Sequence, residues 1–244
     1  LMNTDFLIVI PARYSSSRFP GKPLAMINGK SMLERVWDKC IQVTSKENII
    51  IATDDDRIEE HCKQKQLNYI RTSSNCLTGT DRIAEVAMQI KADFYINVQG
   101  DEPLIEPSDI NLIIEKYMES PGKCYCGMSK ITNEEDFYNP NIPKVVSSSC
   151  NKLIYISRAA IPTTKKLDMI EAKKQVCIYA FTKDSLKEYG LNSKKEENEN
   201  IEDIEILRLI ERGYEVEMVE VSDSSIAVDT PEDLKRVIDY LDEL

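Results

Sequence analysis

Short apolar runs alternate with amphipathic stretches along the first hundred residues of the chain. The apolar runs have the length of strands, and the stretches between them carry apolar residues at helical spacing. In chain order, the pattern predicts a strand at Phe6–Ile10, a helix at Met32–Ile41, a strand at Ile49–Thr53, a helix at Arg57–Lys65, a strand at Leu67–Ile70, a helix at Asp81–Ile90 and a strand at Phe94–Val98. This alternation is typical of β-α-β units and favours a parallel sheet.

The pattern becomes mixed after Ser108. It predicts a helix to about Met118, strands near Cys124–Ser129, Lys144–Ser147, Leu153–Tyr155 and Val176–Phe181, a polar run at Glu196–Glu202, a helix through Ile204, Leu207 and Ile210, a strand at Glu215–Val221 and a closing helix from Pro231 to about Leu241. The added strands are expected to be antiparallel, as is common at the edge of a parallel core. We therefore predict an α/β fold with a doubly wound, mostly parallel sheet and added antiparallel strands.

The composition favours one folded domain, residues 1–244. The chain is 42% apolar and has no long linker rich in Gly, Ser or Pro, so it can bury a full core. Its apolar runs are too short to span a membrane, and residues 1–5 lack the charged start of a signal peptide. We expect a soluble, cytoplasmic protein. The net charge of −11 argues against a nucleic-acid partner, because surfaces that bind nucleic acid are basic.

The cysteine and histidine content does not favour zinc. The seven cysteines form no C-x-x-C pair and their number is odd, so we expect reduced thiols. The only histidine, His61, lies far in sequence from Cys124 and Cys126, which a strand would place on one face. We expect His61 on the surface of a charged helix, so proton removal would fall to a carboxylate, a lysine or a metal-bound hydroxyl.

Three cations lie in the loop between the first strand and the first helix: Arg13, Arg18 and Lys22. Arginine forks grip phosphate oxygens in pairs, lysine adds a point charge, and Gly21 permits a tight turn. The loop can therefore form a triphosphate cradle, although a solvated basic loop has the same composition. No complete P-loop or G-x-G-x-x-G motif occurs, so neither an ATPase nor a dinucleotide oxidoreductase is favoured.

Two carboxylates are candidates for binding Mg²⁺. Asp101 follows a predicted strand, and Asp229 precedes the closing helix. Mg²⁺ prefers carboxylates together with substrate phosphates. A turn-forming aspartate and a helix cap are the structural alternatives. The run Asp54–Asp56 could be a glycosyltransferase metal motif, but we interpret it as a strand end and a helix start, with Asp54 available to contact a nucleoside.

Several ordered motifs resemble those of the 3-deoxy-manno-octulosonate (KDO) cytidylyltransferases, a group of sugar nucleotidyltransferases with a Rossmann-like fold. The matching segments are Ile10–Leu24, Ala52–Asp55, Thr78–Glu85, Asn97–Pro103, Asn139–Asn141, Ser157–Arg158 and Val228–Leu234. The resemblance runs from about Phe6 to Leu241. It implies transfer of CMP from CTP to the anomeric hydroxyl of a sugar acid, for lipopolysaccharide or capsule synthesis, with release of pyrophosphate. It also implies a homodimer, with the strands after Asn139 as interface elements.

The resemblance assigns roles to residues of this chain. Residues of about 1–108 and 215–244 would form the nucleotide and metal part, and residues of about 109–214 the sugar-binding and dimerisation part. The nucleotide set is Pro11, Ala12, Arg13, Arg18, Lys22, Ala52, Thr53, Asp54, Gly79, Thr80 and Arg82. The sugar set is Gln99, Arg158, Gln175, Tyr179, Glu199, Glu202 and Glu205. The catalytic set is Arg13, Lys22, Asp101 and Asp229, of which Asp101 and Asp229 would bind Mg²⁺.

Departures from the family pattern lie in the half that should hold the sugar. Gln175 stands where a histidine is usual, Ile206 where glutamine is common, and Pro143 where valine is usual. A related acid, such as the 8-amino analogue of KDO, whose ammonium would favour nearby glutamates, is therefore a hypothesis beside KDO itself. A nucleotide-sugar-dependent glycosyltransferase and a nucleotide-binding regulatory protein remain the alternative functions.

Overall fold

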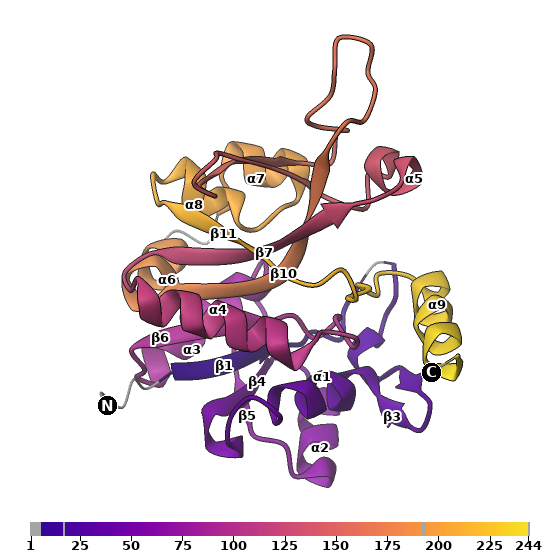
Figure 1. Cartoon of the computed structure of the whole chain (residues 1–244). Helices are drawn as coiled ribbons and strands as arrows, with labels where there is room; N and C mark the ends of the chain where they lie inside the picture. Colours follow the sequence, from indigo (N-terminus) through magenta and orange to yellow (C-terminus); the bar gives the residue numbers. More distant parts are fainter. Residues whose placement is uncertain (1–5, 17, 192–193, 244) are drawn as a thin grey trace.

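A central sheet organises the chain (Figure 1), seen in a computed structural model that describes residues 6–16, 18–191 and 194–243. Within these residues, nine strands form the sheet, and seven of them follow one path. Their order is β11 (Val216–Glu220), β7 (Cys124–Ile131), β10 (Ala172–Thr182), β6 (Phe94–Val98), β1 (Phe6–Pro11), β4 (Ile49–Thr53) and β5 (Tyr69–Arg71). Strands β6, β1, β4 and β5 are parallel, whereas β10 is antiparallel to both β6 and β7. Off this path, β8 (Lys144–Ser147) pairs with β10 and with β9 (Leu153–Ser157).

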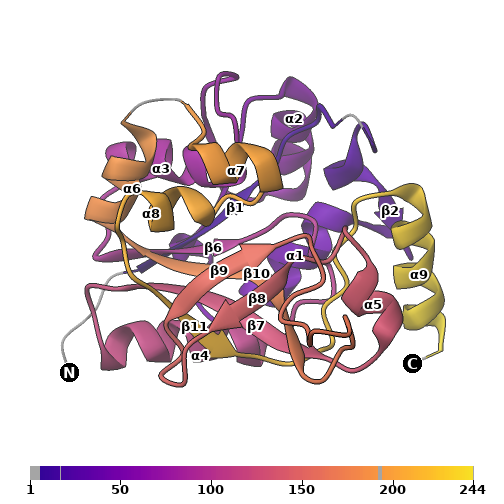
Figure 2. The same ribbon diagram turned by 90° about the horizontal axis from the view of Figure 1, so that it is seen from above.

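Helices cover both faces of the sheet. One apolar core includes side chains of α1 (Met32–Cys40), α2 (Asp56–Lys65) and α4 (Pro107–Glu119). The other includes side chains of α3 (Gly79–Gln89), α6 (Lys183–Gly190) and α8 (Leu207–Glu211). Figure 2 shows α3, α6, α8 and α7 (Glu197–Glu202) together on one side, with α4 on the opposite side. Alternate residues of β1 enter the two cores, which explains why this strand reads as a continuous apolar run.

The remaining elements lie at the margins of the sheet. The closing helix α9 (Pro231–Asp242) packs beside the small hairpin of β2 (Met26–Ile27) and β3 (Lys30–Ser31) (Figure 2). The short elements η1 (Lys22–Leu24), η2 (Lys46–Asn48) and α5 (Glu134–Tyr138) complete the described structure. Among the described residues, no helix combines the length and apolar character needed to cross a bilayer.

The predicted fold class is confirmed, and the strands Phe94–Val98 and Lys144–Ser147 have the predicted bounds. The closing helix also begins as predicted, with Thr230 as its cap and a proline in its first turn. The sequence pattern missed α5 and α6, which directly follow a loop and a strand. It also gave Glu196–Glu202 only as a polar run, whereas α7 forms there, and Asp203 in a left-handed conformation (φ 52°) separates α7 from α8.

Two local predictions are corrected by the structure. The helix predicted from Asp81 begins at Gly79, because the Thr78 side chain caps it in a reciprocal capping box with Asp81. His61, expected on the surface, is largely covered, and its Nε2 lies 2.8 Å from Ser31 Oγ and 3.5 Å from Glu34. Burial lowers the pKa of His61, despite the nearby Glu34 carboxylate.

Candidate active site

A polar cavity of about 450 Å³ opens at the carboxyl ends of β1 and β6. Ligands of doubly wound sheets gather at such strand ends. Predicted site residues that line the cavity are Pro11, Ala12, Arg13, Arg18, Lys22, Gly79, Arg82, Gln99, Asp101, Arg158, Glu205 and Asp229. Lining residues that the sequence analysis did not single out are Ser16, Pro23, Gly100, Pro140, Asn141 and Asp203. The structure thus brings cations and carboxylates from distant segments to one hollow.

Lys22 lies between the two predicted metal ligands. Its Nζ donates to Asp101 Oδ2 at 2.7 Å and to Asp229 Oδ1 at 3.2 Å. Burial of the ammonium disfavours its charge, but the two carboxylates outweigh burial and hold the Lys22 pKa above its ordinary value. Arg18 reaches Asp229 as well, at 3.2 Å. The Lys22 ammonium therefore lies at the point on which both carboxylates converge, and Arg18 contacts one of them.

The donor set at this focus fits a divalent cation that also binds substrate. Asp101 and Asp229 converge on one point, which Lys22 Nζ marks. Across the described residues, no three His, Cys, Asp or Glu side chains are grouped as a closed metal site. Two carboxylates with open positions suit Mg²⁺, which keeps waters and takes its remaining ligands from phosphates. Asp101 and Asp229 are thus the residues that would hold the ion.

Hydrogen bonds connect the loop that carries Asp229 to the segment that follows β6. The Val228 N–H donates to the Asp101 carbonyl at 2.9 Å. Further back in the loop, Ser222 donates to Asp109 through its N–H (3.1 Å), and Ser225 donates to Glu102. These bonds hold the two aspartates on facing segments that are far apart in sequence.

Glycine is required beside Asp101. A Cβ on Gly100 would lie 2.8 Å from the carbonyl oxygen of Pro11, closer than real Cβ contacts. The strand ends of β1 and β6 can therefore approach each other only with glycine at this position. In the cation loop, Gly21 adopts φ 75°, a left-handed conformation that turns the chain into η1 and places Lys22.

Glu102 is a buried carboxyl beneath this site, only 3% exposed. Burial raises its pKa to about 7, and the neighbouring Asp101 carboxylate adds to the shift. Between pH 4.5 and about 7, the Glu102 carboxyl is therefore protonated in the folded protein but ionised in the unfolded chain, where its pKa is the ordinary 4.5. Stability should consequently fall as the pH rises from about 4.5 to 7, and then level off.

Replacing Glu102 by glutamine should remove this pH-dependent loss. We expect the stability of Glu102→Gln relative to the native protein to increase by up to about 3 kcal/mol between pH 4.5 and 8. Urea unfolding at several pH values measures the difference, and Glu106→Gln, at a half-exposed carboxylate nearby, is the control. A difference that does not grow with pH would contradict the assignment, whatever fixed cost the new amide adds.

The first turn of α3, for which the resemblance implies contacts with the nucleotide, forms one wall of the cavity. The Glu205 carboxylate accepts bonds from the Gly79 N–H at 3.0 Å and from the Thr80 N–H at 2.9 Å. Burial raises the Glu205 pKa, and the bonds from Thr80 and Gly79 oppose that shift. Arg82 pairs with Asp54 at 2.8 Å. Glu205 therefore satisfies the helix N-terminus that a ligand could otherwise use.

Other members of the predicted nucleotide set lie behind this wall. Ala52 and Thr53 are fully buried in β4, and Thr80 is buried in α3. The Ala12 N–H donates to the Ala52 carbonyl at 2.9 Å, so β4 supports the cavity wall from below. These three side chains are among the predicted site residues that do not line the cavity.

The acidic run Asp54–Asp56 is engaged with cations of the chain. Asp55 caps α2, as interpreted from the sequence, and also pairs with Arg57 at 2.7 Å. Asp56 pairs with Arg71 at 2.5 Å. The three carboxylates have separate arginine partners rather than a shared focus.

Arg158, which the resemblance assigns to the sugar set, is held by backbone carbonyls. Its guanidinium donates to the carbonyls of Glu202, Asp203 (3.1 Å) and Pro140 (3.0 Å). The Glu202 side chain accepts the Arg158 N–H at 2.9 Å and the Ser157 hydroxyl at 2.6 Å. Glu202 thus supports Arg158 and is not among the residues that line the cavity. Arg158 itself has N–H groups left over for an anion.

Three further residues of the predicted sugar set point elsewhere. Gln175 donates to the Tyr179 hydroxyl at 3.0 Å, and Tyr179 is buried in β10. Neither lines the cavity. Glu199 is fully buried, and both its oxygens bind Arg208, so it is placed away from the sugar position expected for it. A buried guanidinium requires carboxylate partners, and this requirement determines where Glu199 lies.

Comparisons with known proteins identify the family of the chain. A family model described as cytidylyltransferase matches residues 7–222. The chain is 42% identical over 242 residues to a 3-deoxy-manno-octulosonate cytidylyltransferase of Fusobacterium nucleatum, covering 98% of this chain and 97% of the relative. It is 36% identical over 231 residues to the enzyme of the same name from Escherichia coli, covering 95% and 94%.

A solved structure extends the agreement to three dimensions. CMP:2-keto-3-deoxy-manno-octonic acid synthetase, solved in complex with CTP, superposes with a TM-score of 0.90 at 35% identity, covering 98% of this chain and 99% of that one. Sequence, fold and the cavity at the strand ends all lead to the same assignment. The chain belongs to the cytidylyltransferase family, among the 3-deoxy-manno-octulosonate cytidylyltransferases.

Proposed function

We propose that the protein is a Mg²⁺-dependent enzyme that transfers CMP from CTP to the anomeric hydroxyl of KDO or a closely related 3-deoxy sugar acid. The observation that carries the proposal is the convergence of Asp101, Asp229 and Lys22 in a cavity that four arginines also line. The relatives' names supply the substrate class, and the solved relative holds CTP. Because CTP is an intracellular nucleotide, this activity places the enzyme in the cytoplasm.

The side chains divide the reaction between them. Arg13, Arg18 and Lys22 bind the triphosphate, and Arg158 binds the carboxylate of the sugar acid. Asp101 and Asp229 would hold Mg²⁺, which would neutralise phosphate charge. The sugar hydroxyl oxygen bonds to the α-phosphorus while the bond to the β-phosphate oxygen breaks, so pyrophosphate leaves and the hydroxyl proton passes to a carboxylate or to water. Positioning and charge neutralisation supply most of the rate.

The identity of the sugar acid can be tested directly. Purified protein is incubated with CTP and Mg²⁺ and with KDO, its 8-amino analogue or a nine-carbon sialic-type acid, and the CMP-sugar is quantified. We expect a 3-deoxy octulosonate to have the highest kcat/KM. Because Gln175 binds Tyr179 and Glu199 binds Arg208, the structure offers no carboxylate from Glu199 to an added ammonium. A preference for the nine-carbon acid, or no CMP-sugar with any acid, would contradict the proposal.

We further propose that two copies associate through the face around β9 and the segment before β10. Four apolar side chains, Tyr138, Ile154, Leu167 and Ile170, are each more than half exposed there. Strand β9 pairs only with β8 in the described sheet, and Figure 1 shows the segment between β9 and β10 projecting from the body. Exposed apolar surface beside an open strand edge is typical of an interface. A second copy would cover both.

Replacing Ile170 by glutamate should convert the dimer to monomers, because a charge on a buried interface side chain is costly to desolvate. Light scattering coupled to size exclusion gives the mass of each variant. Met88→Glu is the matched control, since Met88 is also more than half exposed but lies on α3, away from this face. A native protein that is monomeric at micromolar concentration, or an Ile170→Glu variant that stays dimeric, would refute the proposed interface.

A further inference from the structure

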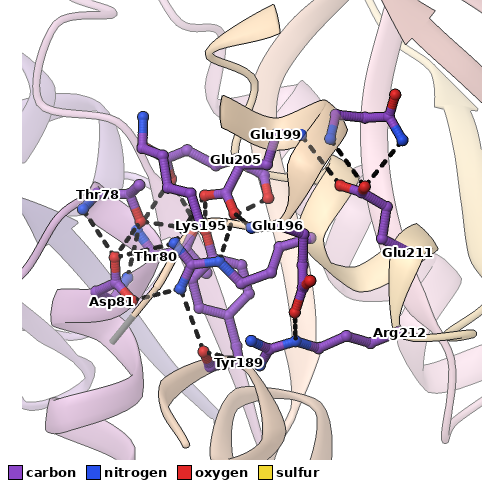
Figure 3. A network of polar contacts seen from close by, with 12 residues as sticks. Thr78, Thr80, Asp81, Tyr189, Lys195, Glu196, Glu199, Glu205, Glu211 and Arg212 are labelled. Carbon is purple, nitrogen blue, oxygen red and sulfur yellow. Dashed lines mark hydrogen bonds and ion pairs between the residues drawn. The ribbon is translucent and has the colours of Figure 1, made fainter. Parts of the chain in front are cut away.

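Arg208 is a fully buried arginine outside the cavity. Its Nε and Nη2 grip the Glu199 carboxylate at 2.6 and 2.7 Å, and its Nη1 donates to Asp81 Oδ1 at 2.6 Å. The guanidinium carbon lies 3.9 Å from the centroid of the Tyr189 ring. Figure 3 shows Asp81, Glu199 and Tyr189 converging in this network. One guanidinium thus joins side chains from α3, α6, α7 and α8.

On one side, the network reaches the nucleotide wall. Asp81 Oδ2 also accepts the Thr78 N–H and hydroxyl, each at 2.8 Å, and these bonds form the cap of α3. Gly79, in the same turn, lines the cavity. Arg208 therefore contacts Asp81, a member of the capping box that orients this wall.

On the other side, the network reaches the sugar wall. Glu199 lies on α7, and the end of α7 supplies the carbonyls of Glu202 and Asp203 that bind Arg158. Helix α8 also holds α7 through Glu211, whose carboxylate accepts the Glu199 N–H at 3.0 Å. A shift of α7 relative to α3 would move Arg158 and Asp203 relative to Gly79 across the cavity.

Stability alone does not account for a buried charged cluster of this kind. Replacing buried ion pairs by apolar groups is often neutral or stabilising, because desolvation costs as much as the pairing gains. What the cluster adds is geometry, since the planar guanidinium fork fixes the direction of each partner. Chemistry between two bound substrates is sensitive to such placement, and a shift of about 1 Å can cost 10²-fold in rate.

We propose that Arg208 is a positioning residue that sets the distance and orientation between the sugar wall and the nucleotide wall of the cavity. This inference rests on the proposed function, because it assigns the two walls to the two substrates. Arg208 itself is not among the residues that line the cavity.

The test uses a variant designed to fold. Arg208→Met combined with Glu199→Gln removes one positive and one negative charge together, leaving Asp81 to cap α3. We expect kcat to fall by about 10²-fold, with the KM of CTP and of the sugar acid changing much less. Arg208→Lys should recover only part of kcat, because an ammonium cannot replace the fork. Far-UV and near-UV circular dichroism confirm the fold of each variant.

Arg212→Met is the matched control. Arg212 follows α8 and donates to Glu196 at 2.8 Å, to the Tyr189 carbonyl at 3.3 Å and to the Glu188 carbonyl; within the described part of the chain, it donates no hydrogen bond to α3. We expect it to lower the melting temperature and keep kcat near the native value. A folded double variant with native kcat, or an Arg212→Met variant with an equal loss, would overturn the proposal.

Two further outcomes are distinguishable. If the double variant does not fold, Glu199→Gln alone keeps the Arg208–Asp81 pair and should still lower kcat several-fold, and native kcat in that variant would overturn the proposal. If the native protein releases no pyrophosphate with CTP and any sugar acid, the proposed function fails first. If the native protein is active and the variants keep the native kcat, the proposed function stands and only the positioning role of Arg208 is refuted.

Discussion

Replacing Asp101 by asparagine is expected to lower kcat by about 10³-fold while the protein stays folded. The carboxylate is one of two that converge on the cation position, and an amide cannot neutralise a divalent ion. Lys22 keeps Asp229 as a partner in this variant, and the Asp101 side chain is 30% exposed, so no buried charge is left unpaired. Steady-state kinetics and circular dichroism measure the two effects.

Asp223→Asn is the control for this prediction. Asp223 is a half-exposed carboxylate that pairs with Lys174 at 2.6 Å, and its change should leave kcat within about 2-fold, as for surface pairs of small energy. Asp229→Asn should behave like Asp101→Asn. If Asp101→Asn retains more than about a tenth of the native kcat, the carboxylate pair does not carry the reaction assigned to it.

Replacing Lys22 by methionine is expected to change two binding reactions in opposite directions. The variant loses a cation to which we assign phosphate binding, so kcat/KM for CTP should fall by about 10²- to 10³-fold. However, Lys22 Nζ also lies between Asp101 and Asp229, so its removal should tighten Mg²⁺ or Mn²⁺ binding. Titration calorimetry with the metal alone measures the second effect.

The opposite signs make this prediction specific. A general loss of structure would weaken both reactions, whereas competition between Lys22 and the metal strengthens one of them. Lys39→Met, at a lysine 3.8 Å from Glu106 on the outside of the molecule, is the matched control and should change neither. Weaker metal binding in Lys22→Met would place the metal elsewhere than between Asp101 and Asp229.

The parallel half of the fold could be predicted from the sequence because its strands are buried on both faces. Strand β6 is fully buried, and such strands appear in the sequence as continuous apolar runs with clear ends. The mixed half was harder to predict. Strand β10 extends from Ala172 to Thr182, beyond the predicted Val176–Phe181, and its register shifts between Val176 and Tyr179. A bulge of this kind has no periodic signal.

The chemistry of the site was predictable from residue types, but its assembly was not. Lys22 contacts Asp229, which is 207 residues away in the sequence, and Glu205 contacts Thr80, which is 125 residues away. Nothing in local periodicity indicates such contacts, so only the family resemblance placed these residues in one site. Asp203 lies in a charged run that usually indicates a solvated loop, and only its left-handed conformation brings it to the cavity.

Glu199 and Arg208 show a second limit of sequence analysis. Charged residues in a polar run and on a short helix are normally solvated, yet both side chains are fully buried and satisfy each other. A burial of this kind depends on the third partner, Asp81, which comes from α3 on the other side of the cavity wall. The sequence contains the residues, but the tertiary structure determines which carboxylate faces the substrate and which faces the guanidinium.

The measurement that tests the account most directly is pyrophosphate release by the purified protein with CTP, KDO and Mg²⁺, each omitted in turn, with the CMP-sugar quantified in parallel. We predict equal amounts of pyrophosphate and CMP-KDO when all three are present, and neither product when any one is missing or when Mg²⁺ is chelated. Pyrophosphate release that needs no sugar acid, or full activity in the presence of a chelator, would contradict the metal-assisted cytidylyl transfer assigned to this cavity.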